Sequence, residues 1–244
     1  MFACAFLPLV VACAVEDAGD GFDHDEPSDL DPVPPGDGKA DAVSAVFDRN
    51  LVVTDAVFTD AGAIDGDGLQ AFFEDTPYHT RSWLADHQID GRRFADALVD
   101  VAVAHGLHPV MLLARMQVEK SIVSKTERPS QRTVDFAFGC GCPDNQPCNE
   151  AYRGLDKQVA CAADVLRTHF DGSVDGTGQW QLGVARKTLD PITITPRSHA
   201  TAALYAYTPW VLQGQGGNWL VWNVTRRYLV ALEEAGLLTP PPEV

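Results

Sequence analysis

Apolar residues recur with helical spacing along most of the chain after residue 43. The clearest example is residues 106–125, GLHPVMLLARMQVEKSIVSK, in which a glycine can end one helix and a proline can begin the next. At about 100° per residue, four side chains of this segment fall on one narrow stripe: Leu112, Met116, Glu119 and Val123. The pattern predicts a helix that carries a single acid in an otherwise apolar seam.

The same spacing predicts further helices at residues 69–74, 92–105, 152–170, 199–207 and 218–236. Because residues 106–108 leave only a very short connection, the helix before them and the helix after them are expected to form an αα-hairpin. Residues 124–150 are rich in Pro, Gly and Cys, which is typical of a long structured loop. Since strand patterns are few, with residues 193–198 irregular, the predicted fold class is mainly α.

The first 42 residues differ from the rest of the chain. Residues 1–15 are apolar and resemble a signal-peptide core. Within them VVAC resembles a bacterial lipobox, in which Cys13 is lipidated, whereas ACA at residues 12–14 fits a cleavage site that gives a soluble secreted protein. Residues 16–42 are acidic, rich in Pro and Gly and almost without apolar periodicity, so we expect a disordered tether. Residues 43–244 form the predicted domain.

Charge and hydropathy restrict the partners. The formal net charge of −16, much of it in the tether, argues against nucleic acid as a partner. The interior of the chain has no apolar run long enough for a membrane-spanning helix, so a membrane is expected only through an N-terminal lipid anchor. We therefore expect an exported, monomeric protein, either a lipoprotein of the bacterial envelope (periplasm or outer membrane) or a secreted protein.

Glu119 is the first candidate for chemistry. A carboxylate in an apolar seam is costly to ionise, and a carboxyl group that retains its proton near neutral pH can act as a general acid. The alternative is structural, because Arg115 lies four residues earlier on the same helical face and can form an ordinary i, i+4 ion pair. Periodicity alone leaves both roles open.

Four cysteines fall within the predicted domain: Cys140, Cys142, Cys148 and Cys161. An even set in an exported domain favours two disulfides, for which three pairings exist. Zinc is the weaker alternative because the set lacks paired C-x2-C spacing, and free thiols are another. No metal and no cofactor are expected.

Three segments resemble a bacterial branch of the lysozyme-like superfamily, related to peptidoglycan lytic transglycosylases. The family pattern NPxxLLxxLQxEQSL is matched by HPVMLLARMQVEKSI at residues 108–122. A GCPD…PC…Y-x-G-F-x-x-Q pattern is matched by FGCGCPD at 138–144, PC at 147–148 and YRGLDKQ at 152–158. An ATxALYxYTP…GGN pattern is matched by ATAALYAYTP at 200–209 and GGNWLVW at 216–222.

The resemblance implies a lysozyme-like helical domain with a long Cys-containing loop that acts on the glycan strand of peptidoglycan. It places the superfamily's catalytic Glu on Glu119. The sequence departs from the family pattern at His108 in place of Asn, at Lys120 after the Glu, and in lacking the Gly-Leu-Met-Gln signature of typical lytic transglycosylases. These departures affect the expected substrate and product more than the expected fold.

The implied reaction is cleavage of the β-1,4 MurNAc–GlcNAc bond with Glu119 as both general acid and base, of the lytic transglycosylase or muramidase type. Hydrolysis normally needs a second carboxyl group. Asp144 is the best candidate, although a turn role after a proline is the simpler interpretation, and Asp135 is the next. The candidate substrate-binding residues are Ser121, Asp144, Gln158, Tyr205 and Tyr207.

Each of these binding roles has a structural alternative. Tyr205 and Trp222 are more simply core aromatics, Gln158 is more simply a helix-surface residue, and Tyr207 is open between a site role and packing. For the whole domain, the alternative is a non-catalytic cell-wall glycan or protein-binding module on a lysozyme-like scaffold. Cleavage of another N-acetylhexosamine polymer, such as chitin, is a weaker third hypothesis.

Overall fold

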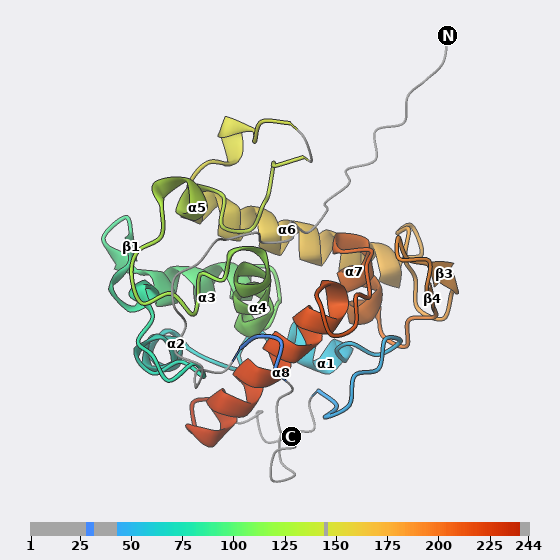
Figure 1. Cartoon of the computed structure of the whole chain (residues 1–244), viewed down its shortest axis with the longest axis horizontal. Coiled ribbons are helices and arrows are strands. Elements are labelled where there is room, and N and C mark those ends of the chain that lie inside the picture. Colours follow the sequence, from blue (N-terminus) through green and yellow to red (C-terminus); the bar gives the residue numbers. More distant parts are fainter. Residues whose placement is uncertain (1–27, 32–42, 144–145, 240–244) are drawn as a thin grey trace.

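A computed structural model describes residues 28–31, 43–143 and 146–239 (Figure 1). The signal segment with Cys13, most of the predicted tether, and Asp144 lie outside the described residues. The mainly α prediction is confirmed. In chain order the described elements are α1 (Asp55–Thr59), α2 (Gly66–Glu74), η1 (Trp83–Asp86), β1 (Gln88–Ile89), β2 (Arg92–Arg93), α3 (Phe94–Ala104), α4 (Pro109–Lys120), α5 (Gln131–Asp135), η2 (Glu150–Tyr152), α6 (Leu155–Val174), β3 (Arg186–Lys187), β4 (Thr193–Ile194), α7 (His199–Tyr207) and α8 (Gly217–Glu234).

Helix α4 is the central element, with α3, α6, α7 and α8 around it (Figure 1). Ten of its twelve residues are buried. Its start is set by His108, whose Nδ1 accepts a hydrogen bond of 3.1 Å from the Val110 amide, and by Pro109, whose fixed φ suits the first helical position. Its end is set by Ser121, which adopts a left-handed conformation at φ 50°. Capping at both ends therefore fixes which residues α4 presents to its neighbours.

The connection between α3 and α4 corrects one prediction. The two helices pack against each other, but the chain changes direction by 115° between them, so they form a corner and not an antiparallel hairpin. Gly106 takes a φ of +61° in the connection, a conformation that glycine adopts without steric cost. No single helix in the described ranges is long and apolar enough to cross a membrane.

Two helix pairs complete the core. Helix α6 packs along α7, and α4 packs along α8. Aromatic contacts tie the periphery to these pairs: the Phe72 ring meets Tyr228 edge-on at 5.1 Å, and Phe58 stacks on Phe170 at 5.2 Å. Such pairs add to the stabilisation from apolar burial. The core is therefore continuous from α2 through α8 to α6.

The region expected to be a long loop contains two short helical elements, α5 and η2. Their few residues give too little periodicity to be recognised in the sequence. Two antiparallel pairs of short strands, β1–β2 and β3–β4, also occur, and β4 lies within residues 193–198, which were expected to be irregular. Strands of two residues carry no readable alternation.

Candidate functional site

Glu119 lies one residue before the end of α4, with 9% of its surface exposed. Its Oε1 forms an ion pair with Nη2 of Arg115, one helical turn earlier, and the exposed fraction of the Arg115 side chain is only 1%. The i, i+4 pair expected from the sequence is therefore present, and it is buried. A buried pair of this kind is more costly to break than a surface pair, because the remaining charge would lack a partner.

Tyr207, at the end of α7, covers the other side of Arg115. The guanidinium carbon lies 4.1 Å from the centroid of the Tyr207 ring, which is a cation–π contact. The Tyr207 hydroxyl donates to the Phe138 carbonyl oxygen at 3.4 Å. Burial raises the pKa of Tyr207 to about 12, so the hydroxyl keeps its proton at neutral pH. Tyr207 is thus within the candidate site, in contact with Arg115 and not through a hydrogen bond to Glu119.

Residues 138–140 form a wall beside Glu119. Gly139 has a φ of +68°, and a Cβ atom placed there would lie 3.6 Å from Glu119 Oε2. The two carboxylate oxygens therefore have different surroundings, since Oε1 meets Arg115 and Oε2 faces the backbone of Gly139. Residues 138–140 were not among the site residues predicted from the sequence, although they belong to the FGCGCPD motif at residues 138–144.

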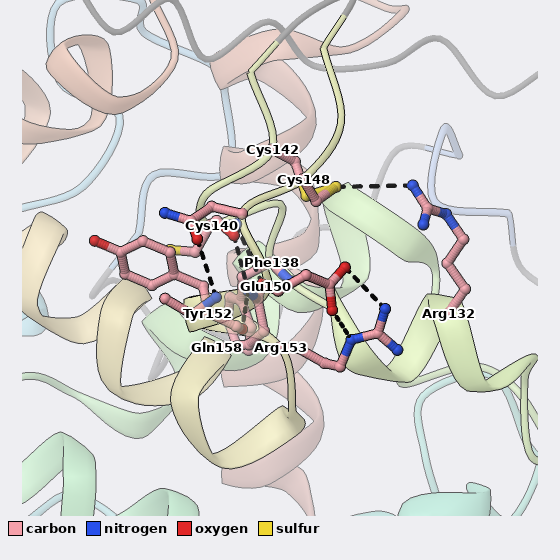
Figure 2. Close-up of a disulfide and its surroundings, with 11 residues drawn as sticks. Arg132, Phe138, Cys140, Cys142, Cys148, Glu150, Tyr152, Arg153 and Gln158 are labelled. Carbon is pink, nitrogen blue, oxygen red and sulfur yellow. Dashed lines mark hydrogen bonds and ion pairs between the residues drawn. A yellow bond between two sulfur atoms is a disulfide. The ribbon is translucent and has the colours of Figure 1, made fainter.

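Gln158 of α6 holds residues 138–140 in place (Figure 2). It is fully buried on α6, and its Oε1 accepts hydrogen bonds of 3.1 Å from the amides of both Phe138 and Cys140. Its Nε2 donates to the carbonyl oxygens of Cys140 and Tyr152, each at 2.8 Å. The expectation of a surface position was wrong, because the side chain lies inside the protein. Its hydrogen-bonding groups hold backbone, so in this conformation it positions the wall.

The four cysteines form the two disulfides that the sequence predicted. Cys140 pairs with Cys161, with a Cα–Cα distance of 6.3 Å, and this bond ties the wall to α6. Cys142 pairs with Cys148 and closes a small loop (Figure 2). The pairing excludes the zinc and free-thiol alternatives for these four residues. Two disulfides are typical of exported proteins.

Ser121 follows the carboxylate by two residues and is half-buried. Its left-handed conformation is uncommon for a residue with a side chain, and such strain is found at functional sites more often than elsewhere. The carbonyl oxygen of Ser121 accepts a hydrogen bond from the Ser124 hydroxyl at 3.1 Å. The structure therefore places Ser121 close to Glu119 along the chain, at a sharply defined turn.

Tyr205 lies away from the surface. It is fully buried and stacks on Trp180, with the ring centroids 5.1 Å apart. Trp222 is 5% exposed, and its indole nitrogen donates to the Ser44 carbonyl oxygen at 3.0 Å. Both placements agree with the core alternative raised from the sequence. A sugar-stacking role for Tyr205 would require the core to open.

Of the two candidates for a second catalytic carboxyl group, Asp135 lies within the described residues. Asp135 at the end of α5 is 6% exposed and pairs with Arg153 at 3.0 Å. It also accepts a hydrogen bond of 2.7 Å from Gln131. These partners give Asp135 a structural role in holding α5 to the loop before α6.

Comparison with known proteins gives no relative from which to transfer a function. No protein-family model, no curated protein and no solved structure matches this chain.

Proposed function

We propose that this domain cleaves the β-1,4 MurNAc–GlcNAc bond of peptidoglycan glycan strands, with Glu119 as the single general acid and base. The observation that carries the proposal is the placement of Glu119. It is a carboxylate at the end of the buried central helix, between an arginine on one side and a braced loop wall on the other. The motif resemblance independently selects the same residue.

In the proposed reaction, Glu119 donates a proton to the glycosidic oxygen as that bond breaks. It then removes a proton from the C6 hydroxyl of the MurNAc unit, whose oxygen attacks C1 and closes a 1,6-anhydro ring. The carboxyl group ends the cycle as it began, and no water is consumed. Glu119 must carry a proton at the first step, so substrate binding has to rearrange its contact with Arg115. Oε2, on the Gly139 side, is the oxygen that we assign to proton transfer.

The wall supports this assignment through its rigidity. Gln158, the Cys140–Cys161 disulfide and the Tyr207 hydroxyl each hold residues 138–140. Catalysis depends on groups held within a fraction of an ångström of the productive geometry. We propose that these contacts keep the backbone of Gly139 at a fixed distance from the reacting carboxyl oxygen.

Release of soluble fragments from purified peptidoglycan sacculi tests the proposal. Wild-type protein should release fragments and Glu119→Gln should not, because the amide can neither donate nor accept the proton. The matched control is Glu127→Gln, which removes one charge from an exposed glutamate. Equal release by wild type and Glu119→Gln would contradict the proposed role.

A second candidate function is a non-catalytic module that binds cell-wall glycan or protein. The observation that favours it is the closure of the site, in which Glu119 is 9% exposed and ion-paired. Under this hypothesis the protein co-sediments with sacculi, the Glu119→Gln variant binds equally well, and neither releases fragments. The resemblance to a lysozyme-like scaffold is compatible with both functions.

A further inference from the structure

Residues 28–31, which the sequence assigns to the acidic tether, lie against α4 and α8. Two residues of α8 hold their backbone. The Asn223 amide donates to the carbonyl oxygens of Asp29 and Asp31, at 2.7 and 2.9 Å. Arg227 donates to the carbonyl oxygens of Ser28 and Asp31, at 2.6 and 3.0 Å. Four contacts to carbonyl oxygens within four residues are characteristic of peptide recognition, in which side-chain donors bind backbone acceptors.

The Asp29 side chain is held separately from its backbone. Gln117 of α4 donates to one carboxylate oxygen at 2.6 Å, and the Tyr78 hydroxyl donates to the other. The Tyr78 oxygen lies 3.1 Å from the hydroxyl of Tyr228, which belongs to α8. Two donors, one from α4 and one from the connection between α2 and η1, therefore converge on one carboxylate.

The protein side of this contact is built from buried polar groups. With residues 28–31 in place, Gln117 is 1% exposed, Asn223 is fully buried and Arg227 is 7% exposed. An amide or guanidinium that is buried without a partner is destabilising, so these side chains require acceptors such as those that the segment supplies. A tether that remained solvated would leave all three side chains without these acceptors.

We propose that the α4–α8 face is a binding site for an aspartate-bearing peptide turn, and that its occupant is residues 28–31 of the same chain, in which the Asp31 amide donates to the Ser28 carbonyl oxygen at 2.9 Å. The face recognises the Asp29 carboxylate and the backbone carbonyl groups around it. This assignment is independent of the proposed glycan cleavage, since none of the residues that contact the segment belongs to the Glu119 site.

Docking changes where the tether leaves the domain. An extended chain spans at most about 3.5 Å per residue. For a protein anchored at Cys13, the fifteen residues to Ser28 reach about 50 Å, whereas the thirty residues to Val43 reach about 100 Å. For a protein anchored at Cys13, docking therefore halves the maximum distance between the anchor and the point at which the chain meets the domain.

The site is also connected to the turn after Glu119. Gln117 binds Asp29, donates to the Ser124 hydroxyl at 3.0 Å and accepts from the Ser124 amide at 3.1 Å. Without the Asp29 carboxylate, the side-chain amide of Gln117 loses one of its hydrogen-bond acceptors. We expect a smaller, secondary loosening of residues 121–124 when the segment leaves.

Amide hydrogen exchange on the full chain tests the proposal. In the wild type, amides of residues 28–31 should exchange slowly for a segment near the N-terminus. Asp29→Asn should speed their exchange by about tenfold. The NH2 group of Asn would face Gln117 or Tyr78, which are themselves donors, and a charge-assisted hydrogen bond would be lost. The control is Asp31→Asn, since the Asp31 side chain is exposed and bonds only within the segment, to the Ser28 amide at 2.8 Å.

A competing peptide provides the second measurement. A labelled peptide with the sequence of residues 26–33 should bind the full-length Asp29→Ala variant more tightly than the wild type, in which the chain's own segment occupies the face. The same peptide with Asn at the position of Asp29 should bind weakly. The proposal is overturned by unprotected amides at residues 28–31 in the wild type. It is equally overturned by exchange that Asp29→Asn leaves unchanged, or by peptide binding that does not depend on the aspartate.

Discussion

At the scale of single residues, burial assigns different roles to similar side chains. Glu119 and Asp135 are both buried acids with an arginine partner, but the Glu119 partner is fully enclosed and the Arg153 partner of Asp135 is half exposed. The sequence could predict the Arg115–Glu119 pair from its spacing of four residues. It could not predict that Tyr207 covers the arginine, because α4 and α7 are far apart in the sequence and only the tertiary fold brings these side chains together.

Removing one partner of the buried pair should be costly. We expect Arg115→Met to lower the free energy of unfolding by about 3 kcal/mol, since it leaves a buried carboxyl group without its partner. The double variant Arg115→Met/Glu119→Gln should lose less than the sum of the two single variants. Urea denaturation of the four proteins measures this coupling. Additive losses would show that the two side chains do not stabilise each other.

His108 gives a pH-dependent prediction. Burial lowers its pKa from its ordinary value near 6.5 to about 4. The unfolded chain therefore binds a proton between these values and the folded chain does not, so stability is complete above pH 6.5 and is lost as pH falls toward 4. The contribution of this residue is about 3 kcal/mol at most.

The matched variant is His108→Asn, which retains a side-chain acceptor for the Val110 amide but does not titrate. Its thermal midpoint should fall less than that of the wild type between pH 6.5 and 4.5. Parallel curves for the two proteins would show that His108 does not titrate as described.

At the scale of elements, the pattern of apolar residues located most long helices to within a few residues. The prediction of residues 199–207 coincides with α7, and 218–236 is close to α8. The wall at residues 138–140 could not be predicted, since its conformation depends on a glutamine from α6 and a disulfide, neither of which leaves a periodic pattern. The number of disulfides was predictable, but their pairing required the fold.

Gln158, the Cys140–Cys161 disulfide and the Tyr207 hydroxyl all hold the wall, and removal of the first two should have separable effects. The Cys140–Cys161 disulfide closes a loop of 21 residues, so Cys140→Ala/Cys161→Ala should lower the free energy of unfolding by about 3 kcal/mol. The pair Cys142→Ala/Cys148→Ala, whose loop spans six residues, is the control and should lose less. Thermal and urea denaturation measure both. Equal losses would contradict the proposed importance of the bond to α6.

Gln158→Leu should destabilise the wall through a different cause. It leaves the amides of Phe138 and Cys140 buried without their acceptor, which costs about 1–3 kcal/mol for each group. We expect fast hydrogen exchange at these two amides, while exchange in the core of α4 remains slow. Unchanged exchange at both amides would argue against Gln158 as the residue that positions the wall.

At the scale of the whole molecule, residues 28–31 differ from the disorder expected for the tether to which they belong. Its composition predicts disorder, yet residues 28–31 occupy a specific position on α4 and α8. Composition could not reveal this contact, because the donors that recognise the segment come from side chains roughly 50, 90 and 200 residues away.

The most direct test of the central claim is mass spectrometry of peptidoglycan incubated with the full chain and with its Glu119→Gln variant. The proposed mechanism predicts fragments ending in 1,6-anhydro MurNAc from the wild type and none from the variant, with both proteins folded by circular dichroism. Reducing-end fragments would retain Glu119 as the acid but require a second carboxyl group. Intact peptidoglycan after incubation with folded wild-type protein would contradict the enzyme proposal and leave the binding module.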